Sequence, residues 1–483
     1  MYYTSVIHFY LLHTQEIVRP SMMIRNPVLR LQAPPLSASS RRYTPQCGLT
    51  QQGHRFLSAV AVTSKEPSAT SGLLRRFVAS SSRYVTLTTL LHIISPSCSI
   101  PHLSFIAFPL YSMIEQKSWF RWNTKVVADL IAFLHKEGRF DEAEKLFDGI
   151  VSKLGFDDAE KLSDGLALNL GFHKEKELYT FYINLITAYA VHKHERGCLD
   201  ACEQLKQLIL SSSSVHLKKK GYLSMILGLC EIGLPYKAEI LMDEMRENGI
   251  TVSSYEMKSV VYGYGQNGFL EDMKRVVGQM ENEGFELDTI CFNMVLSSFG
   301  ANNKLHDMLV WLKKMRDLNV PLSVRTYNSV LNSCPRINSL VIDAKNWPLS
   351  IDELSRSLES DEEVNLVMEL MKTSVLDEAM VWNENESRVD LHGMHLASAY
   401  LILLQWFNES RVRFDCGNYG TPKKISIVCG RGKNSPRQGD SPVKKLAKEM
   451  VVRMKCPLII DKKNSGCFIG KGIVFRKWLL DTA

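Results

Sequence analysis

Asp390 and His392 lie two residues apart near the C-terminal end of the chain, in the sequence Asp-Leu-His-Gly. We expect this segment to be a short strand, on which residues two apart point to the same face. A carboxylate beside an imidazole orients the ring, and a ring held in this way can move a proton in general acid–base catalysis. The alternative is structural: Asp390 caps the following helix, and His392 is a hydrogen-bonded histidine without a chemical role.

A second motif, rich in glycine and basic residues, lies between a predicted strand, "KKISIVCG", and a predicted helix, "PVKKLAKEMVVRM". Backbone N–H groups in such a loop can point at a phosphate. Residues 411–483 hold 17 Lys and Arg against five Asp and Glu, a net charge of +12. The loop therefore predicts contact with a nucleic-acid backbone. Its candidate residues are Gly430, Arg431, Gly432, Lys433 and Asn434.

Metal binding has weaker support in the sequence. His392 and His395 could ligate a metal, but no third ligand is evident. Cys198 and Cys202 lie beside two histidines, and we interpret them as small residues on a buried helix face because the spacing of a metal site is missing. The 11 cysteines include no pair of Cys-x-x-Cys motifs, which argues against a disulfide scaffold or a zinc ribbon. We therefore predict no cofactor, except a divalent metal such as Mg²⁺ if the C-terminal segment cleaves phosphodiesters.

The elements that must position these motifs alternate between strands and helices from Arg388 onward. "RVDLHG" is a strand, and "MHLASAYLILLQWFNE" has the apolar stripe of a helix. The strand "KKISIVCG" and the helix "PVKKLAKEMVVRM" follow, and "PLIIDKKNSGCFIGKG" predicts two short strands around a turn. Residues 388–483 are therefore expected to form a small α/β domain.

The middle of the chain repeats with a period of 35 residues. Met245, Met280 and Met315 are spaced 35 apart, and so are several apolar positions around them. Gly233 and Gly268 fall between the two apolar runs of their units, so each unit predicts a helix, a turn and a second helix. One helix pair cannot bury its own apolar face, and we therefore expect an all-α solenoid of stacked pairs.

This pattern resembles the pentatricopeptide repeat family, whose unit is a helical hairpin of 35 residues. The runner-up is the tetratricopeptide repeat, a protein-binding solenoid with a period of 34 whose sequence pattern is absent here. The resemblance places a solenoid at residues 85–344, and its clearest repeats are 124–158, 219–253, 254–288 and 289–323, with a partial one from Val324.

The resemblance implies binding of single-stranded RNA, one base for each repeat. In this family the fifth and last positions of a repeat carry most of the base choice. An amide such as that of Asn293 offers both a donor and an acceptor to a base edge. The repeats are not basic, so the alternative is that these residues are solvated positions in a protein-binding solenoid. The corresponding residues are Leu223 with Ser253, Lys258 with Asp288, Asn293 with Ser323, and Asn328 in the partial repeat.

The C-terminal α/β segment resembles the Smr domain over Arg388 to about Leu480. The family's first signature is represented by Asp390-Leu391-His392-Gly393 and its second by the glycine loop, in which Asn434 stands where the family has His. Together with the repeats, this architecture resembles plant PPR-SMR proteins, which act on organelle RNA. The resemblance implies Asp390 and His392 as candidate catalytic residues of an RNA endonuclease. Loss of the loop histidine leaves a non-catalytic RNA clamp as the alternative.

The remaining segments predict an organelle-targeting segment and a connector between the domains. Residues 1–84 hold ten Lys and Arg against two acids and many serines, the composition of an organelle transit peptide or of a disordered segment. The chloroplast is preferred on family resemblance, with the mitochondrion as alternative. The apolar stretch from Val85 is interrupted by Pro96 and Pro101, so we expect helices without a membrane span. Residues 345–387 are acid-rich and predict a solvated helical connector.

The sequence as a whole therefore predicts selective binding of single-stranded organellar RNA, in RNA processing, stability or translation. Other RNA-processing proteins are expected partners. The alternative is an adaptor: a solenoid that binds protein or RNA without catalysis, joined to a basic Smr module that clamps RNA.

Overall fold

The protein is described by a computed structural model. It describes residues 49–63, 67–96, 101–154, 172–342, 347–358, 361–372, 379–415, 420–430 and 441–481. These residues form two compact units, of which the first ends at Ile250 and the second begins at Thr251. Within the described residues, no helix combines the length and the apolar character that a membrane span requires.

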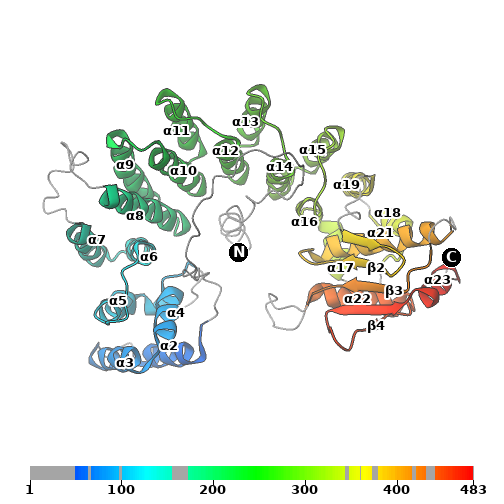
Figure 1. Ribbon diagram of the computed structural model, residues 1–483, viewed down its shortest axis with the longest axis horizontal. Helices are drawn as coiled ribbons and strands as arrows, with labels where there is room; N and C mark the ends of the chain where they lie inside the picture. Colours follow the sequence, from blue (N-terminus) through cyan, green and yellow to red (C-terminus); the bar gives the residue numbers. More distant parts are fainter. Residues whose placement is uncertain are drawn as a thin grey trace, which may run out of the picture. The chain divides into compact units, whose positions relative to one another are not determined.

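The first unit begins with a group of short helices (Figure 1, blue). They are α2 (Gln51–Thr63), α3 (Pro67–Ser80), α4 (Arg83–Ile93), η1 (Pro101–Ile106) and α5 (Ala107–Glu115). Phe56 of α2 stacks on Phe77 of α3 with ring centroids 3.9 Å apart, and both rings are buried. The expectation of disorder up to residue 84 is therefore wrong for residues 51–63 and 67–80, because apolar side chains of α2 and α3 pack against one another. The described residues of the stretch from Val85 form helices, as expected.

Three helix pairs complete the first unit. They are α6 (Thr124–Lys136) with α7 (Phe140–Leu154), α8 (Phe172–Val191) with α9 (Glu195–Ser211), and α10 (Val215–Glu231) with α11 (Pro235–Glu247). The first helix of each pair contacts the first helix of the next, so α6, α8 and α10 form one row (Figure 1). Cys198 and Cys202 of α9 are buried, as expected for small residues on an inner helix face.

The second unit continues the same arrangement with α12 (Ser254–Gln266), α13 (Leu270–Asn282), α14 (Thr289–Ala301), α15 (Leu305–Asp317), α16 (Val324–Leu331) and α17 (Pro335–Ile342). Here α12, α14 and α16 form the row of first helices. Turns at Gly268 and Gly284 have positive φ, at +78° and +81°. Asn303 and Asn319, 35 residues later, take the same left-handed backbone at 54° and 55°, a conformation that Asn tolerates better than most residues. The predicted helical hairpins are therefore confirmed within each unit.

The acidic segment that follows is more deeply embedded than a solvated connector. It forms α18 (Ile351–Ser357) and α19 (Asp361–Lys372). Glu363 is buried, and its two carboxylate oxygens accept the backbone N–H groups of Arg336 and Ile337 at 3.1 and 3.2 Å. Glu369, also buried, pairs with Arg316 of α15. The expectation that the acids keep this segment solvated is wrong for these two residues, since each carboxylate has partners on the repeats.

The C-terminal α/β domain is built on a five-stranded sheet with the order β1-β2-β3-β5-β4 (Figure 1, yellow to red). The strands are β1 (Met380–Trp382), β2 (Glu386–Asp390), β3 (Lys424–Val428), β4 (Ile459–Ile460) and β5 (Cys467–Lys471). Among the described strands, only β2 and β3 pair in parallel. The domain boundary expected at residue 388 is therefore too late, because β1 lies in the predicted connector and pairs with β2.

Three helices complete this domain: α21 (Leu396–Asp415), α22 (Pro442–Arg453) and α23 (Gly472–Asp481). α21 connects the parallel strands β2 and β3, and it contacts α16, α17, α22 and α23. Its side chains are buried around most of the helix, including Trp406 and Tyr400. The apolar stripe that predicts this helix therefore covers only part of its buried surface, because α21 is packed between the repeats and the rest of the α/β domain.

Candidate nucleic-acid interface and candidate active site

The last residues of the repeats 219–253, 254–288 and 289–323 have a structural role, since each caps the helix that follows. Ser253 is the N-cap of α12, where the N3 residue Glu256 accepts the Ser253 backbone N–H at 2.8 Å. Asp288 caps α14 through Oδ1, which accepts the N–H of Cys291 at 2.9 Å. Ser323 caps α16 and accepts the N–H of Thr326 at 3.3 Å. These residues therefore fix the start of each first helix, whatever else they contact.

Lys258 and Asp288 are brought together by the structure. Lys258 Nζ lies 2.7 Å from Asp288 Oδ2, and the Lys258 side chain is only 12% exposed. The same carboxylate thus caps α14 with one oxygen and neutralises Lys258 with the other. The two residues of a predicted base-reading pair are therefore in contact, and Asp288 neutralises the charge of Lys258.

Asn293 and Ser323 also meet, through a hydrogen bond of 3.2 Å from Asn293 Nδ2 to Ser323 Oγ. Asn293 is 4% exposed, and its Oδ1 has no hydrogen-bond partner among the described residues. A buried carbonyl oxygen without a donor costs free energy that an N–H group would recover. The oxygen is shielded from solvent, so a base edge that supplies the missing donor would reach it once the Asn293 side chain turns outward.

The other predicted reader residues divide between the units. Leu223 lies on α10 in the first unit and is half-buried, and an aliphatic side chain offers no hydrogen bond to a base. Asn328 lies on α16 in the second unit, and its amide is bonded to the C-terminal domain rather than to the last residue of a repeat. Base reading by these residues stays a prediction.

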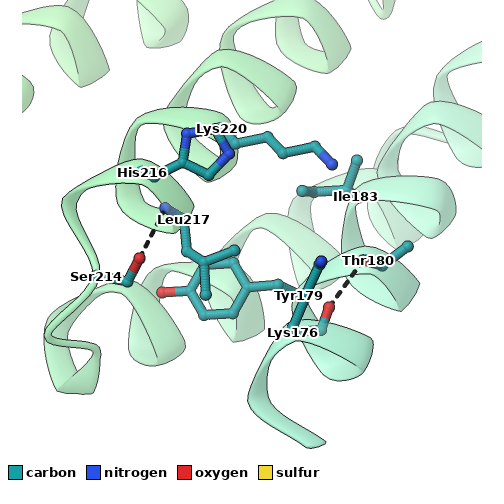
Figure 2. Close-up of a pocket in the computed structure, with 8 residues that line it drawn as sticks. All are labelled: Lys176, Tyr179, Thr180, Ile183, Ser214, His216, Leu217 and Lys220. Atoms are coloured by element: carbon teal, nitrogen blue, oxygen red, sulfur yellow. Dashed lines mark hydrogen bonds between the residues drawn. The ribbon is translucent and has the colours of Figure 1, made fainter. Parts of the chain in front are cut away.

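A pocket that the sequence did not indicate lies between α8 and α10 (Figure 2). It has a volume of about 200 Å³ and is lined by Lys176, Tyr179, Thr180, Ile183, Ser214, His216, Leu217 and Lys220. The buried Tyr179 ring and Leu217 form an apolar side, while Lys176, His216 and Lys220 bring nitrogen atoms to the rim. Such a lining suits a phosphate beside a planar ring. The sequence signal that could have indicated this pocket is the basic run Lys218–Lys220 at the start of the repeat 219–253, of which Lys220 lines the pocket.

Asp390 and His392 are in direct contact. Asp390 Oδ1 lies 2.6 Å from His392 Nδ1 and accepts the His392 backbone N–H at 2.9 Å. His392 lies past the end of β2, so the prediction that both residues stand on one strand is wrong. The turn formed by the Asp390 side chain brings the ring back, and both side chains are largely exposed. The pair can orient an imidazole whose Nε2 lies beside Gly430, at the start of the glycine loop.

The parallel pairing of β2 and β3 places this pair beside the glycine loop. Asp390 pairs with Val428 at the carboxyl ends of the two strands, and Leu391 N–H donates to Val428 O at 2.8 Å. A Cβ on Gly430 would lie 3.0 Å from His392 Nε2, so the ring covers the first residue of the loop. Loops after the carboxyl ends of adjacent parallel strands commonly form ligand sites. Arg431, Gly432, Lys433 and Asn434 lie outside the described residues.

His395 lies against Asn332 of α16. Burial lowers the pKa of His395, and the nitrogen and oxygen of the Asn332 amide lie 2.8 and 3.0 Å from its Nδ1. Within the described parts of the chain, no group of three or more His, Cys, Asp or Glu side chains could hold a metal ion.

Comparison with known proteins places the repeats in a family. The model for the pentatricopeptide repeat domain matches residues 240–302 and 275–336, and the model for the PPR repeat matches residues 130–153 and 222–250. The chain is 45% identical over 433 residues to pentatricopeptide repeat-containing protein At2g17033 of Arabidopsis thaliana, which covers 89% of this chain and 82% of that protein. The chain is also 34% identical to pentatricopeptide repeat-containing protein At1g74750 of the same plant over 98 residues, which cover 20% of this chain and 11% of that protein.

Solved structures show weaker similarity. The crystal structure of the pentatricopeptide repeat protein PPR10 from maize aligns with 84% of this chain at a TM-score of 0.34 and 14% identity. This chain spans 62% of that one. PPR10 in complex with an 18-nt psaJ RNA element aligns with 66% of this chain and 54% of that one, at a TM-score of 0.24 and 12% identity.

Proposed function

Because this chain belongs to the pentatricopeptide repeat family, we propose that it binds single-stranded RNA along the first helices of its repeats. The observation that carries this proposal is the amide of Asn293. It is buried, held by Ser323 through Nδ2, and lacks a partner for Oδ1 among the described residues. A base edge with an N–H donor would complete it once the Asn293 side chain turns outward. Lys258 with Asp288 would form the neighbouring reader, one repeat earlier.

Selection from a randomised RNA library with the full chain tests this proposal. Asn293→Ser should change the base preferred at one position by about 1–3 kcal/mol of discrimination while the other positions keep their preference. Leu223→Ala changes the same position of an earlier repeat, and it should leave every base preference unchanged, because an aliphatic side chain offers no hydrogen bond to a base edge before or after the change. If the full chain shows no preference for single-stranded RNA over duplex, the repeats are instead a protein-binding surface.

The C-terminal domain is proposed to be an Smr domain that acts on the RNA bound by the repeats. The contact between Asp390 and His392, with Gly430 beside the ring, supports this assignment. His392 would move a proton in phosphodiester cleavage, a contribution of about 10²–10⁴-fold for a general acid or base. The glycine loop, including Gly432, would hold the neighbouring phosphate through its backbone and its basic side chains.

A nuclease assay on bound RNA, with and without Mg²⁺, separates cleavage from clamping. Wild type, His392→Ala and Asn434→His are compared. His392→Ala should abolish cleavage while circular dichroism and RNA affinity remain unchanged. Asn434→His should raise activity, since an imidazole can transfer protons and an amide cannot. No cleavage from any of the three would identify the domain as a basic module that clamps RNA.

The proposed place of action is an organelle, with the chloroplast preferred over the mitochondrion. Residues 1–84 are basic, rich in serine and poor in acids. A reporter fused to the N-terminal 84 residues is therefore expected in plastids. A reporter found in mitochondria would make the mitochondrion the organelle of action, and a reporter left in the cytosol would refute the proposed transit peptide. RNA-processing proteins that copurify with the full chain would identify the expected partners.

A further inference from the structure

Asn328 occupies the same repeat position as Asn293 and Lys258, at intervals of 35 residues. The side chains of Asn293 and Lys258 bond to the last residue of their own repeats, Ser323 and Asp288. Asn328 does not follow this pattern. Its Nδ2 donates to Gly393 O at 2.8 Å, and its Oδ1 accepts the backbone N–H of His395 at 2.9 Å. Both hydrogen-bonding ends of the amide are therefore engaged by the loop that contains His392.

A second residue of α16 strengthens this contact. Asn332 lies one turn after Asn328, and its amide contacts Nδ1 of His395. Asn328 also supplies the hydrogen bond that the backbone N–H of His395, just before α21, would otherwise lack. The two asparagines thus hold the loop between β2 and α21 at Gly393 and at His395, on the C-terminal side of His392.

The helix that bears these asparagines is itself held firmly. The hydroxyl of Tyr327, a fully buried residue, donates to Leu370 O of α19 at 2.8 Å and lies 3.3 Å from Gln405 Oε1 of α21. Rotation of α16 that freed Asn328 would break these buried hydrogen bonds, each of which is costly to leave unpaired. Asn328 therefore remains directed at the Gly393 loop.

We propose that Asn328 is a positioning residue and that base reading along the repeats ends with Asn293 and Ser323. Asn328 instead holds the Asp390–His392 pair at the place where the next base would otherwise be read. This inference rests on the proposed binding of RNA. Since each repeat reads one base, the backbone unit that meets His392 lies directly beside the base selected by Asn293. The contact sets a fixed spacing between the selected sequence and the phosphodiester that the C-terminal domain handles.

The test uses the full chain and two measurements on the same RNA. Library selection records the base preference at each position, and a photo-cross-linking amino acid placed at residue 392 records which nucleotide meets the loop. The cross-link should fall on the nucleotide next to the one whose preference Asn293→Ser changes. Asn328→Ala should leave every base preference unchanged and spread the cross-links over several neighbouring nucleotides.

Asn328→Asp provides a second variant in case Asn328→Ala does not fold. It keeps the size and the acceptor but places a carboxylate against Gly393 O, so it should also spread the cross-links. A changed base preference beside the Asn293 position in either variant would show that Asn328 reads a base and would overturn the inference. Cross-links that stay on one nucleotide in both variants would overturn it as well. Absence of RNA binding by wild type would instead refute the proposed function and, with it, this inference.

Discussion

The ring of His392 lies against Gly430, and a Cβ at that glycine would stand 3.0 Å from Nε2 and 3.1 Å from Cδ2 of the ring. Gly430 also has a φ of +77°, a conformation that L side chains rarely adopt. The glycine is thus required twice, for the backbone of the loop and for the space that the ring occupies. Position 430 therefore couples the glycine loop to the Asp390–His392 pair.

Gly430→Ala should destabilise the protein by about 1–2 kcal/mol through the left-handed backbone alone. It should also displace His392 and reduce cleavage or cross-linking at that residue. Thermal unfolding and the nuclease or cross-linking assay measure the two effects. Gly420→Ala is the control, because no atom lies within 4 Å of its added Cβ. Equal behaviour of the two variants would contradict the contact with His392.

Asp288→Asn should strengthen RNA binding and make it more dependent on salt. Asn remains a good N-cap for α14, while the loss of the carboxylate frees Lys258 from its 2.7 Å ion pair. One additional phosphate contact on a single strand steepens the slope of log affinity against log salt by about 0.7. Asp307→Asn is the control, since it removes the same charge from a 3.1 Å pair between the second helices of two repeats, α13 and α15, while Lys274 keeps its pair with Glu271. If both variants changed the RNA affinity and its salt dependence equally, the effect would come from net charge rather than from Lys258.

His192 should make the first unit sensitive to acid. The ring is buried against Phe133, its Nδ1 has no partner among the described residues, and burial, with smaller contributions from Lys136 and His194, lowers its pKa to about 4. Between pH 6.5 and about 4 the unfolded chain binds the proton that the folded chain excludes, so stability falls as pH falls. The loss is on the order of 3 kcal/mol.

Urea unfolding of wild type and His192→Gln across this pH range measures that contribution as a difference between the two proteins. The difference is needed because burial raises the pKa of Asp129, in the same unit, to about 6. A carboxyl with a raised pKa destabilises the fold as pH rises, which opposes the histidine. Parallel pH dependence in the two proteins would show that His192 does not titrate as proposed.

Glu363→Ala should destabilise the second unit by about 1–3 kcal/mol, because it leaves the N–H groups of Arg336 and Ile337 without their carboxylate acceptor. Glu362→Ala removes the same charge from an exposed neighbour and should have little effect. Chemical unfolding of the full chain, followed by a probe in the second unit, compares the two variants. If Glu362→Ala lost as much stability as Glu363→Ala, the effect would come from the removed charge rather than from the lost hydrogen bonds to Arg336 and Ile337.

The sequence by itself determined the helical hairpins and the order of elements from β2 to β5, but not β1 or α23. Both follow from local periodicity, because apolar residues that recur every three to four positions form a helix whichever neighbour covers them. The turns followed too: the positions of Gly268 and Gly284 adopt positive φ even where Asn303 and Asn319 replace glycine. The spacing of 35 residues also brought Lys258 to Asp288 and Asn293 to Ser323, since the last residue of a repeat caps the next first helix, which packs beside the first helix that bears the fifth residue.

The tertiary structure decided which polar groups were already engaged. Asn328 has the residue type and spacing of a reader, yet Gly393 and His395 take both ends of its amide. Glu363 and Glu369 have the composition of a solvated connector, yet contacts with the repeats bury them. His392 meets Gly430 only because β2 and β3 pair in parallel. A hydrogen bond between distant residues depends on which surfaces pack together, and local periodicity carries no information about that choice.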